Sequence, residues 1–166
     1  MSNEFKQYQV IKNVRLPLSM QKKLMQTIAD AEEDPFLDSE ELRRPGIKQV
    51  IVDMASGRIA GFFMPYTTMV RDVRHWRSGA LYLDPAYRGM GIMQWALRDF
   101  FTTHSPGIVW IEESNEKSIK LFTKLGFEKG KPLSYEGVKG HWYILPKQEV
   151  AMEEYVETKR RRRYAW

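Results

Sequence analysis

The sequence predicts a mixed α/β (α+β) fold, in which a mostly antiparallel sheet is flanked by helices. Strand-like stretches alternate with helical ones, and a glycine-rich loop joins a strand to a helix in the middle of the chain. The length of 166 residues suits one domain, and contents of 43% hydrophobic and 28% charged residues are ordinary for a globular protein. We expect this domain over residues 1–146 and an additional helix over residues 147–166.

The N-terminal part of the chain predicts a strand, a helix and a loop. Residues 7–14 have the composition of a strand. Ser19 suits the N-cap of a helix that continues to about Ala31, because apolar residues follow it at helical spacing. Residues 34–45 are rich in acidic residues and proline, and they predict a loop or a short second helix.

Three strands are expected between residues 47 and 83. Residues 47–53 and 58–67 form a hairpin around a turn at residues 55–57. Residues 79–83 form a further short strand, which ends at the dipeptide Asp84-Pro85.

The next stretch predicts a helix over residues 92–103 and a buried strand over residues 107–111. Because a strand, a helix and a strand follow one another within about 30 residues, the two strands are expected to be parallel. The apolar side of the helix comprises Ile92, Met93, Trp95, Ala96 and Phe100.

A second helix is expected over residues 115–125, with Gly126 as its C-cap. Two strands follow over residues 133–136 and 140–145, and a turn at Gly137 joins them.

Positive charge is concentrated at the C-terminus. The chain has 26 Lys and Arg against 21 Asp and Glu, and one run over residues 159–163 accounts for the whole net charge of +5. Acidic residues early and basic residues late in the last segment suit the dipole of a charge-segregated helix. Three interpretations of the basic run stay open: a solvated helix end, a contact with an acidic partner or a second subunit, and a contact with nucleic acid.

Several classes of protein are excluded by what the chain lacks. It has no Cys, which excludes disulfide scaffolds, Cys-ligated metals and a Cys nucleophile. The three His residues show no ligand spacing, so no metal site is expected. The longest mostly apolar run, residues 59–66, is far shorter than the roughly 20 residues that span a bilayer. The first residues are polar, so we expect a cytoplasmic protein without a membrane partner.

The loop Arg-Gly-Met-Gly-Ile-Met over residues 88–93 has the features of an anion site. Gly89 and Gly91 lack side chains where a backbone approaches a ligand, and the loop opens a helix whose first N–H groups have no helical partner. Arg88 adds a charge that matches phosphate. The loop predicts a diphosphate-binding turn, with a simple tight turn as the alternative. It lacks the Lys of a P-loop and the third glycine of a dinucleotide-binding loop.

A second motif begins at Asn115 and reads Asn-Glu-Lys-Ser-Ile-Lys-Leu-Phe-Thr-Lys-Leu-Gly-Phe. With the loop before it, this run resembles the GNAT superfamily of acetyl-CoA-dependent N-acetyltransferases. In that family an Arg/Gln-x-x-Gly-x-Gly/Ala loop is followed by an Asn-x-x-Ala/Ser-x-x-Leu-Tyr-x-x-Leu-Gly-Phe helix. The resemblance covers about residues 45–145. It implies a central mixed sheet with a splayed pair of parallel strands, and acetyl transfer to a primary amine by direct attack in a ternary complex.

The resemblance also implies a site for acetyl-CoA as co-substrate. Backbone groups of residues 81–83 would pair with the pantetheine arm, and residues 88–93 would hold the pyrophosphate. Asn115 would lie near the pantetheine or the acetyl group. The residues implied in cofactor binding are Leu81, Leu83, Arg88, Gly89, Met90, Gly91, Ile92, Met93, Asn115, Ser118 and Phe122.

Two positions depart from the family pattern. Met93 stands where the family has Gly or Ala, so its side chain either points into the core or narrows the site. Phe122 stands where the family usually has the Tyr that protonates the CoA thiolate, and Phe has no proton to donate. An alternative function is therefore a catalytically weak or inactive GNAT fold that serves as a binding or assembly protein.

Direct attack of an amine on a thioester needs a base, a proton donor and a fixed geometry. Glu112 and Glu113, at the end of a strand, are candidate bases, and strand alternation lets at most one of them enter the cleft; Glu112 is preferred. Tyr82 and His75 are further candidates. Tyr143 could replace the missing acid. The acceptor amine has no transferable sequence code.

Overall fold

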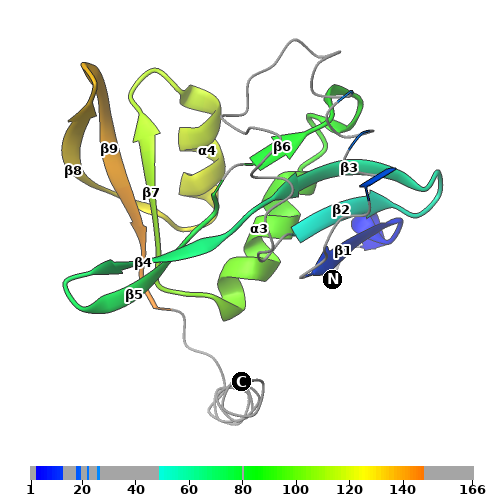
Figure 1. Ribbon diagram of the computed structural model, residues 1–166, viewed down its shortest axis with the longest axis horizontal. Helices are drawn as coiled ribbons and strands as arrows, with labels where there is room; N and C mark the ends of the chain where they lie inside the picture. The colour runs from blue at the N-terminus through cyan, green and yellow to red at the C-terminus, as the bar shows by residue number, and fades with distance from the viewer. Residues whose placement is uncertain are drawn as a thin grey trace, which may run out of the picture. The chain divides into compact units, whose positions relative to one another are not determined.

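The computed structural model describes residues 3–12, 18, 19, 22, 26, 49–79 and 81–147. The chain divides into two compact units, Met1–Leu97 and Arg98–Trp166, and each is described by itself (Figure 1). The loop expected at residues 34–45, and the expected C-terminal helix with its basic run beyond Lys147, lie outside the described residues.

Four strands form an antiparallel sheet in the first unit. β1 (Tyr8–Lys12) pairs with β2 (Gln49–Asp53), β2 pairs with β3 (Arg58–Phe63), and β3 pairs with β6 (Leu81–Leu83). All five residues of β2 are buried, and the apolar run Val-Ile-Val over residues 50–52 accounts for the burial of its middle. The predicted first strand and the predicted hairpin around residues 55–57 are confirmed.

The core of this sheet is a cluster of Val50, Val52, Phe62 and Tyr82. The rings of Phe62 and Tyr82 lie on neighbouring strands, with centroids 6.1 Å apart. Gly61 permits this pairing, because a Cβ atom at residue 61 would collide with the carbonyl oxygen of Tyr82. The short strand β6 is thereby held close to β3, and it leads directly into the glycine-rich loop.

A second hairpin in this unit is absent from the sequence prediction. β4 (Tyr66–Val70) pairs with β5 (Val73–Arg77) around Arg71 and Asp72, which have φ values of 48° and 64°. Such a turn is normally marked by Gly or Asn, and this one is not, so the sequence gives no turn signal.

The predicted strand over residues 58–67 is wrong as a single element, because it is interrupted at Met64 and Pro65 between β3 and β4. Proline cannot donate a backbone hydrogen bond to a neighbouring strand, and a strand breaks there readily. The last strand of the unit, β6, begins at Leu81 rather than at Gly79.

The predicted helix over residues 92–103 is confirmed as α3 (Ile92–Thr103), and the boundary between the two units falls within it. Trp95 is only half-buried, and its ring stacks on Phe5 with centroids 5.4 Å apart. The residues of α3 that are buried are Ile92, Met93, Ala96, Leu97, Phe100 and Phe101. Leu97 and Phe101 therefore join the apolar side that the spacing predicted.

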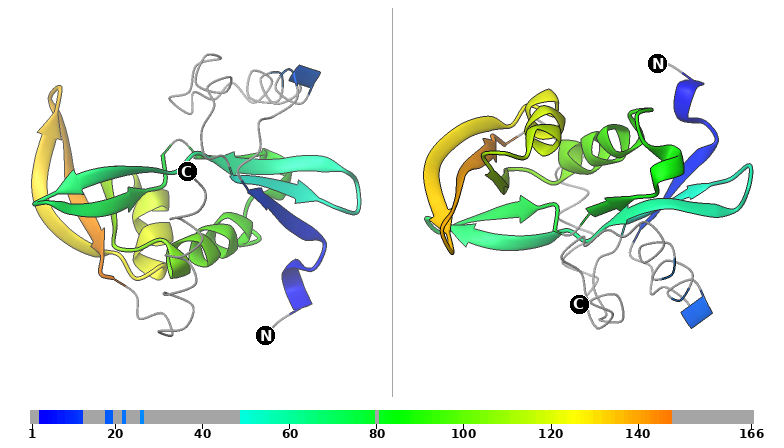
Figure 2. Two further views of the ribbon diagram at one scale, coloured as in Figure 1. Left: turned by 60° about the horizontal axis from the view of Figure 1, so that its bottom comes forward. Right: turned by 90° about the horizontal axis from the view of Figure 1, so that it is seen from above.

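The second unit contains a three-stranded antiparallel sheet with β9 (Val138–Leu145) in the middle. β7 (Gly107–Glu112) and β8 (Glu128–Tyr135) pair with its two sides, and α4 (Glu116–Lys124) lies against this sheet (Figures 1 and 2). The predicted turn at Gly137 is confirmed, but both strands are longer than predicted. Seven of the eight residues of β8 are exposed, so pairing with β9 rather than burial defines the strand.

α4 ends in the manner that the sequence predicts. Gly126 has a φ of 98°, its N–H donates to the carbonyl oxygen of Thr123 at 3.0 Å, and the N–H of Phe127 donates to that of Phe122 at 3.0 Å. These two bonds form a Schellman motif. They bring Phe127 back onto the helix, where its ring packs edge-on against Phe122 at 5.2 Å and Phe101 at 5.1 Å.

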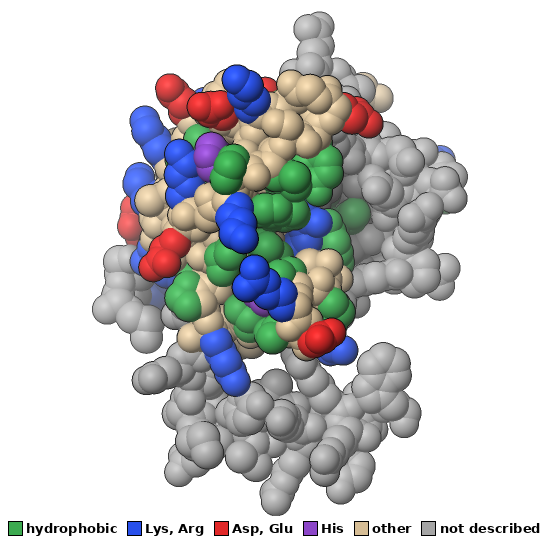
Figure 3. Space-filling view, turned by 90° about the vertical axis from the view of Figure 1, so that its left-hand side faces the viewer, with side chains coloured by type: hydrophobic (Ala, Val, Ile, Leu, Met, Phe, Trp, Pro, Cys, Tyr) green, Lys and Arg blue, Asp and Glu red, His purple; other side chains and the backbone are tan. Residues whose placement is uncertain are grey.

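β8 is the last strand in its sheet and is protected against further pairing. The register of β8 shifts between Lys129 and Pro132, and irregularity, lysine and proline all discourage the addition of another strand. Figure 3 views the side on which β8 lies and shows apolar side chains at the surface among Lys and Arg side chains. The exposed apolar residues of this hairpin are Leu133, Tyr135, Val138 and Ile144.

Near the N-terminus, Leu18, Ser19, Lys22 and Gln26 are helical, in agreement with the predicted helix. Leu18 is already helical, one residue before the predicted N-cap Ser19. In the part of the chain that the structure describes, no helix combines the length and the apolar character needed to cross a membrane.

Candidate active site

The segment between β6 and α3 is a tightly bonded turn. It begins with η2 (Pro85–Tyr87), a single turn of 3-10 helix. The carboxylate of Asp84 caps this turn by accepting the N–H of Ala86 at 2.9 Å, and the N–H of Tyr87 donates to the carbonyl oxygen of Asp84 at 2.8 Å. Pro85 suits the first position of such a turn because its φ is fixed and no N–H is needed there. The dipeptide Asp84-Pro85 therefore ends the strand by starting η2.

Both glycines of the loop adopt a backbone conformation that favours glycine. Gly89 and Gly91 have φ values of 80° and 78°, in the left-handed region that other residues avoid. A Cβ atom at Gly89 would meet nothing within 4 Å, and one at Gly91 would meet only the ring of Phe5 at 3.8 Å. The backbone conformation, and not a lack of space, therefore requires glycine at both positions. The space beside the two Cα atoms is open.

The first turn of α3 presents backbone donors at this loop. The N–H of Trp95 makes the first helical bond, to the carbonyl oxygen of Gly91 at 3.0 Å. The N–H groups of Ile92, Met93 and Gln94 precede it and have no acceptor within the helix. The side chain of Met93 is buried, with an exposed fraction of 6%, so it points into the core rather than over the turn.

Arg88 lies at the start of the loop and is attached to the end of β6. Its Nε donates to the carbonyl oxygen of Leu83 at 2.9 Å, and its guanidinium carbon lies 5.9 Å from the centre of the Tyr82 ring. Arg88 is exposed. The structure thus brings Tyr82, Leu83 and Arg88 together with the helix N-terminus, which is an arrangement suited to an anionic ligand.

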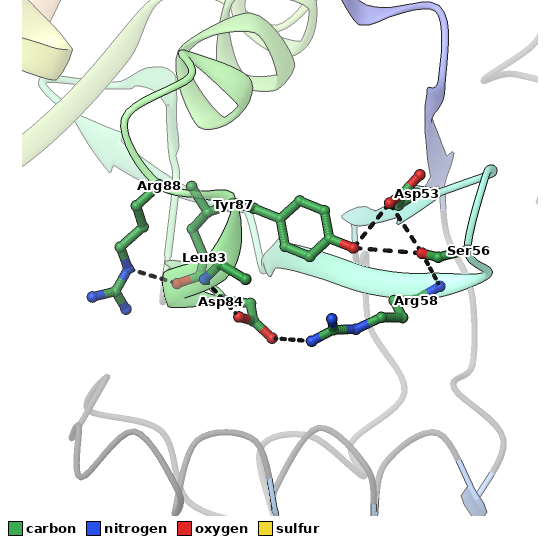
Figure 4. A network of polar contacts seen from close by, with 8 residues as sticks. Asp53, Ser56, Arg58, Leu83, Asp84, Tyr87 and Arg88 are labelled. Carbon is green, nitrogen blue, oxygen red and sulfur yellow. Dashed lines mark hydrogen bonds and ion pairs between the residues drawn. The ribbon is translucent and has the colours of Figure 1, made fainter.

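Behind the turn lies a polar cluster that the sequence analysis did not identify (Figure 4). Asp53, at the end of the buried strand β2, accepts hydrogen bonds from the hydroxyl of Tyr87 at 2.9 Å, from Ser56 Oγ at 3.0 Å and from the N–H of Ala55 at 3.0 Å. A further bond comes from the amide of Gln7 at 3.5 Å. The available signal was the acidic residue that directly follows the apolar run Val-Ile-Val.

Electrostatics keep Asp53 ionised and Tyr8 neutral. Burial by itself raises the pKa of Asp53, but hydrogen bonds from Tyr87, Ser56 and the backbone lower it by more, so its pKa lies below the ordinary 3.8. Burial and the negative charge of Asp53 raise the pKa of Tyr8 above 10.0. The ring of Tyr8 lies edge-on to that of Tyr87, with centroids 6.2 Å apart.

Arg58 connects the same cluster to the cap of η2. Its Nη2 lies 3.4 Å from Asp84 Oδ2, and its guanidinium carbon lies 5.7 Å from the centre of the Tyr87 ring. The arginine side chain is largely exposed, so this ion pair contributes little stability by itself.

The second motif opens α4 in the second unit. Asn115 is the N-cap of α4, and its Oδ1 accepts the N–H of Ser118 at 3.2 Å. Asn115 is exposed, Ser118 is half-buried, and Phe122 is buried against Phe127. The cap accounts for an asparagine at this position without any ligand. The contact of Asn115 with the cofactor that the resemblance implies therefore needs evidence of its own.

The four candidate acids and bases have different surroundings. Glu112 is exposed and accepts the hydroxyl of Ser114 at 2.9 Å, while Tyr143 is buried in β9 opposite Val109. In the first unit, Tyr82 is buried in the sheet core. The Nδ1 atom of His75 lies 3.0 Å from the carbonyl oxygen of Val73 on its own strand. Among the described residues, no three His, Asp or Glu side chains lie together so as to hold a metal ion.

A family model described as the acetyltransferase (GNAT) family matches residues 19–127, which include both the loop and the helix α4. The chain belongs to this family. GNAT proteins use acetyl-CoA as the acetyl donor, which confirms the expected co-substrate. Among functionally curated proteins, none matches this GNAT sequence significantly.

Solved structures with the same fold include several N-acetyltransferases. A chain of the NatC complex bound to Gag peptide and CoA matches with a TM-score of 0.64 and 16% identity, over 84% of this chain and 98% of that chain. Ribosomal-protein-S5-alanine acetyltransferase from Vibrio fischeri matches with a TM-score of 0.65 and 18% identity, over 86% and 94% of the two chains. Ribosomal-protein-S18-alanine N-acetyltransferase from Escherichia coli matches with a TM-score of 0.63 and 15% identity, over 87% and 96%.

These likenesses establish the fold of this GNAT protein. The predicted fold class, a mixed α+β fold with a mostly antiparallel sheet and a parallel pair of strands, is confirmed.

Proposed function

We propose that this protein is an N-acetyltransferase that moves an acetyl group from acetyl-CoA to a primary amine by direct attack in a ternary complex. The turn at residues 88–93 carries the proposal: two glycines of positive φ lead to the open N-terminus of α3, with Arg88 beside it. An anionic pyrophosphate complements the positive end of the helix dipole and the backbone donors there. The matching family model supports the same reaction class.

The two motifs would divide the binding of acetyl-CoA. Residues 88–93 would hold the pyrophosphate through backbone N–H groups and Arg88, and the backbone of residues 81–83 would pair with the pantetheine arm. Asn115, Ser118 and Phe122 would lie near the thiol end of the cofactor. The support is that the first N–H groups of α3 have no acceptor within the helix. The roles of Asn115, Ser118 and Phe122 come from the family motif.

In the reaction, the amine nitrogen attacks the thioester carbonyl carbon, a C–N bond forms and the C–S bond breaks. The attacking nitrogen must lose a proton, and the CoA thiolate must gain one. Glu112 is our first candidate for the base, because it is an exposed carboxylate that the hydroxyl of Ser114 orients. Tyr143 is our candidate for the acid, since Phe122 has no proton to give. Tyr82 and His75 are the remaining candidates.

Calorimetric titration with acetyl-CoA tests the first half of the proposal, and mass spectrometry of acetylated products tests the second. Peptides with free α-amino groups come first among the acceptors, because two structural neighbours are named for alanine of ribosomal proteins and a third was bound to a peptide. Lysine side chains and polyamines come next. The matched control is the double variant Arg88→Ala, Gly91→Val, which should neither bind nor transfer. Absence of acetyl-CoA binding to the wild-type protein would end the proposal.

The alternative, a GNAT fold without turnover, is not favoured. It was motivated by Met93 and Phe122, and the side chain of Met93 is buried away from the turn. Acetyl-CoA binding without transfer to any amine in the panel would restore it. A cytoplasmic location stays a prediction. A contact through residues 159–163 also stays a prediction, and salt-dependent binding measurements with and without residues 159–166 can test it.

A further inference from the structure

The glycine-rich loop has few side-chain contacts of its own that could keep its backbone in one conformation. Gly89 and Gly91 are the residue type with the greatest backbone freedom in an unbound chain, and neither has a close side-chain neighbour at its Cα other than the edge of Phe5. A loop that must be ordered when a ligand arrives reduces the affinity for that ligand, because the ordering entropy opposes binding. The rigidity of this turn must therefore come from the residues on either side of it.

On the N-terminal side, the turn is fixed by a residue from another part of the chain. Tyr87 immediately precedes Arg88, and its hydroxyl donates to Asp53 Oδ2 at 2.9 Å in a buried environment (Figure 4). Tyr87 and Asp53 are only 7% and 6% exposed, and they lie 34 residues apart in the sequence. A hydrogen bond to a buried carboxylate is stronger than one between neutral groups.

The other bonds of Asp53 explain why the acceptor is stationary. Ser56 Oγ and the N–H of Ala55 also donate to it, both from the turn of the β2–β3 hairpin. Asp53 closes the fully buried strand β2 and is paired in register with Tyr8 of β1 and Arg58 of β3. The carboxylate is therefore part of the sheet framework, and Tyr87 connects that framework to the turn.

We propose that Asp53 and Tyr87 are positioning residues for cofactor binding: their hydrogen bond anchors η2 to the β2–β3 hairpin and thereby holds Arg88 and the glycine loop in the shape that receives the pyrophosphate. This inference rests on the proposed binding of acetyl-CoA. Neither residue touches the ligand in this account. Both act through the backbone of residues 84–88, which the bonds from Tyr87 N–H to Asp84 and from Arg88 N–H to Pro85 close into one rigid turn.

The central experiment is a double-mutant cycle on acetyl-CoA affinity with Tyr87→Phe and Asp53→Asn. Tyr87→Phe removes only the hydroxyl and keeps the ring contacts with Tyr8 and Arg58. We expect each single variant to raise the Kd for acetyl-CoA by about tenfold, in line with the loss of one charge-assisted bond. The double variant should be little weaker than either single variant, because both act on the same bond: Tyr87→Phe removes its donor, and Asp53→Asn removes the negative charge that strengthens it.

A matched control distinguishes a loss of affinity caused by general destabilisation from one caused by the loss of positioning. Ile51→Val removes one methyl group from the fully buried middle of β2, which lowers overall stability by an amount similar to one hydrogen bond. It should leave the Kd for acetyl-CoA within about twofold of wild type. An equal rise in Kd for Ile51→Val would show that affinity merely follows stability, and the inference would be wrong.

Hydrogen exchange of the ligand-free protein supplies a readout that does not depend on the cofactor. The hydrogen-bonded amides of residues 86–88 should exchange about tenfold faster in Tyr87→Phe than in wild type, while those of α4 stay unchanged. If Tyr87→Phe alters neither this exchange nor the Kd, the positioning role is refuted. If the wild-type protein does not bind acetyl-CoA, the proposed function fails instead, whatever the exchange shows.

Discussion

The two helices that carry the family motifs begin in different ways. The N-terminus of α4 is completed by its own residues, because Asn115 caps the helix and accepts the N–H of Ser118 three positions on. The N-terminus of α3 has no such cap among its described contacts, and it follows two glycines of positive φ. Its shape depends on η2, which in turn is bonded to Asp53 of a distant strand.

This difference shows how one chain can build a locally stable helix start and an open one. A capped helix has used one of its terminal donors internally, and an uncapped helix keeps these donors for a ligand. The open start gives up the stabilisation of a cap, and contacts from elsewhere in the fold must hold it. Substitutions at the two starts should therefore have opposite signatures: loss of ligand affinity at α3 and loss of stability at α4.

The largest effect is expected for Gly91→Val in the α3 turn. A β-branched side chain at a φ of 78° is strained, and it also occupies the open space beside the helix N-terminus. Affinity for acetyl-CoA should fall by about 100-fold or more in calorimetry, from the combined loss of loop shape and donor access. Gly137→Val is the control, since Gly137 has a φ of 81° and open space beside its Cα but lies in the β8–β9 turn. A similar loss of affinity in both variants would contradict a specific role for Gly91.

Arg88→Ala should reduce affinity for acetyl-CoA by about 10- to 30-fold, the usual loss for one charge-assisted bond to phosphate. Stability should change little, because the side chain of Arg88 is exposed and the substitution leaves the backbone bond from Arg88 to Pro85 in place. The dependence of Kd on salt should weaken at the same time, since one cation is gone. Arg88→Lys should recover only part of the affinity, because the ammonium cannot make the planar paired contact. If Arg88→Ala binds acetyl-CoA with the affinity of wild type, Arg88 does not contact the pyrophosphate.

At the other helix start, Asn115→Ala should lower the free energy of unfolding by about 1 kcal/mol, the usual worth of an N-cap. Denaturant titration measures this loss. Asn115→Ser keeps a capping oxygen and should retain most of the stability. Reduced acetyl transfer in the stable Asn115→Ser variant would establish a contact with the cofactor beyond the cap, whereas normal transfer would leave the cap as its whole role.

The smallest effect is a change in acid sensitivity. The pKa of Asp53 is lowered in the folded protein, so its ionised form stabilises the fold above the ordinary pKa of 3.8, and this contribution is lost as pH falls through the lowered value. Asp53→Asn should therefore be less stable at neutral pH and should lose less stability than wild type below about pH 4. Tyr87→Phe should fall between the two, because the donors Ser56 and Ala55 remain. If the melting temperatures of wild type and Asp53→Asn fall equally as the pH is lowered, the lowered pKa of Asp53 is contradicted.

Much of the fold was predictable because its signals are local. The bounds of α3 follow from apolar spacing, and the end of α4 follows from Gly126, which adopts a φ of 98°. The hairpin at Arg71 and Asp72 was missed because these residues adopt positive φ without being Gly or Asn. The length of β8 was underestimated because its residues are exposed, and a strand held by pairing leaves little hydrophobic pattern.

The sequence by itself determined the family and the two motifs, because glycines at positive φ, a cap residue and helical spacing depend on neighbours a few positions away. It also predicts an anion site at Arg88 and the glycine loop. Only the tertiary structure decided that Met93 points into the core and that Asp53 receives the hydroxyl of Tyr87. These facts depend on strands far apart in sequence that pair in one register, and no local pattern encodes that pairing.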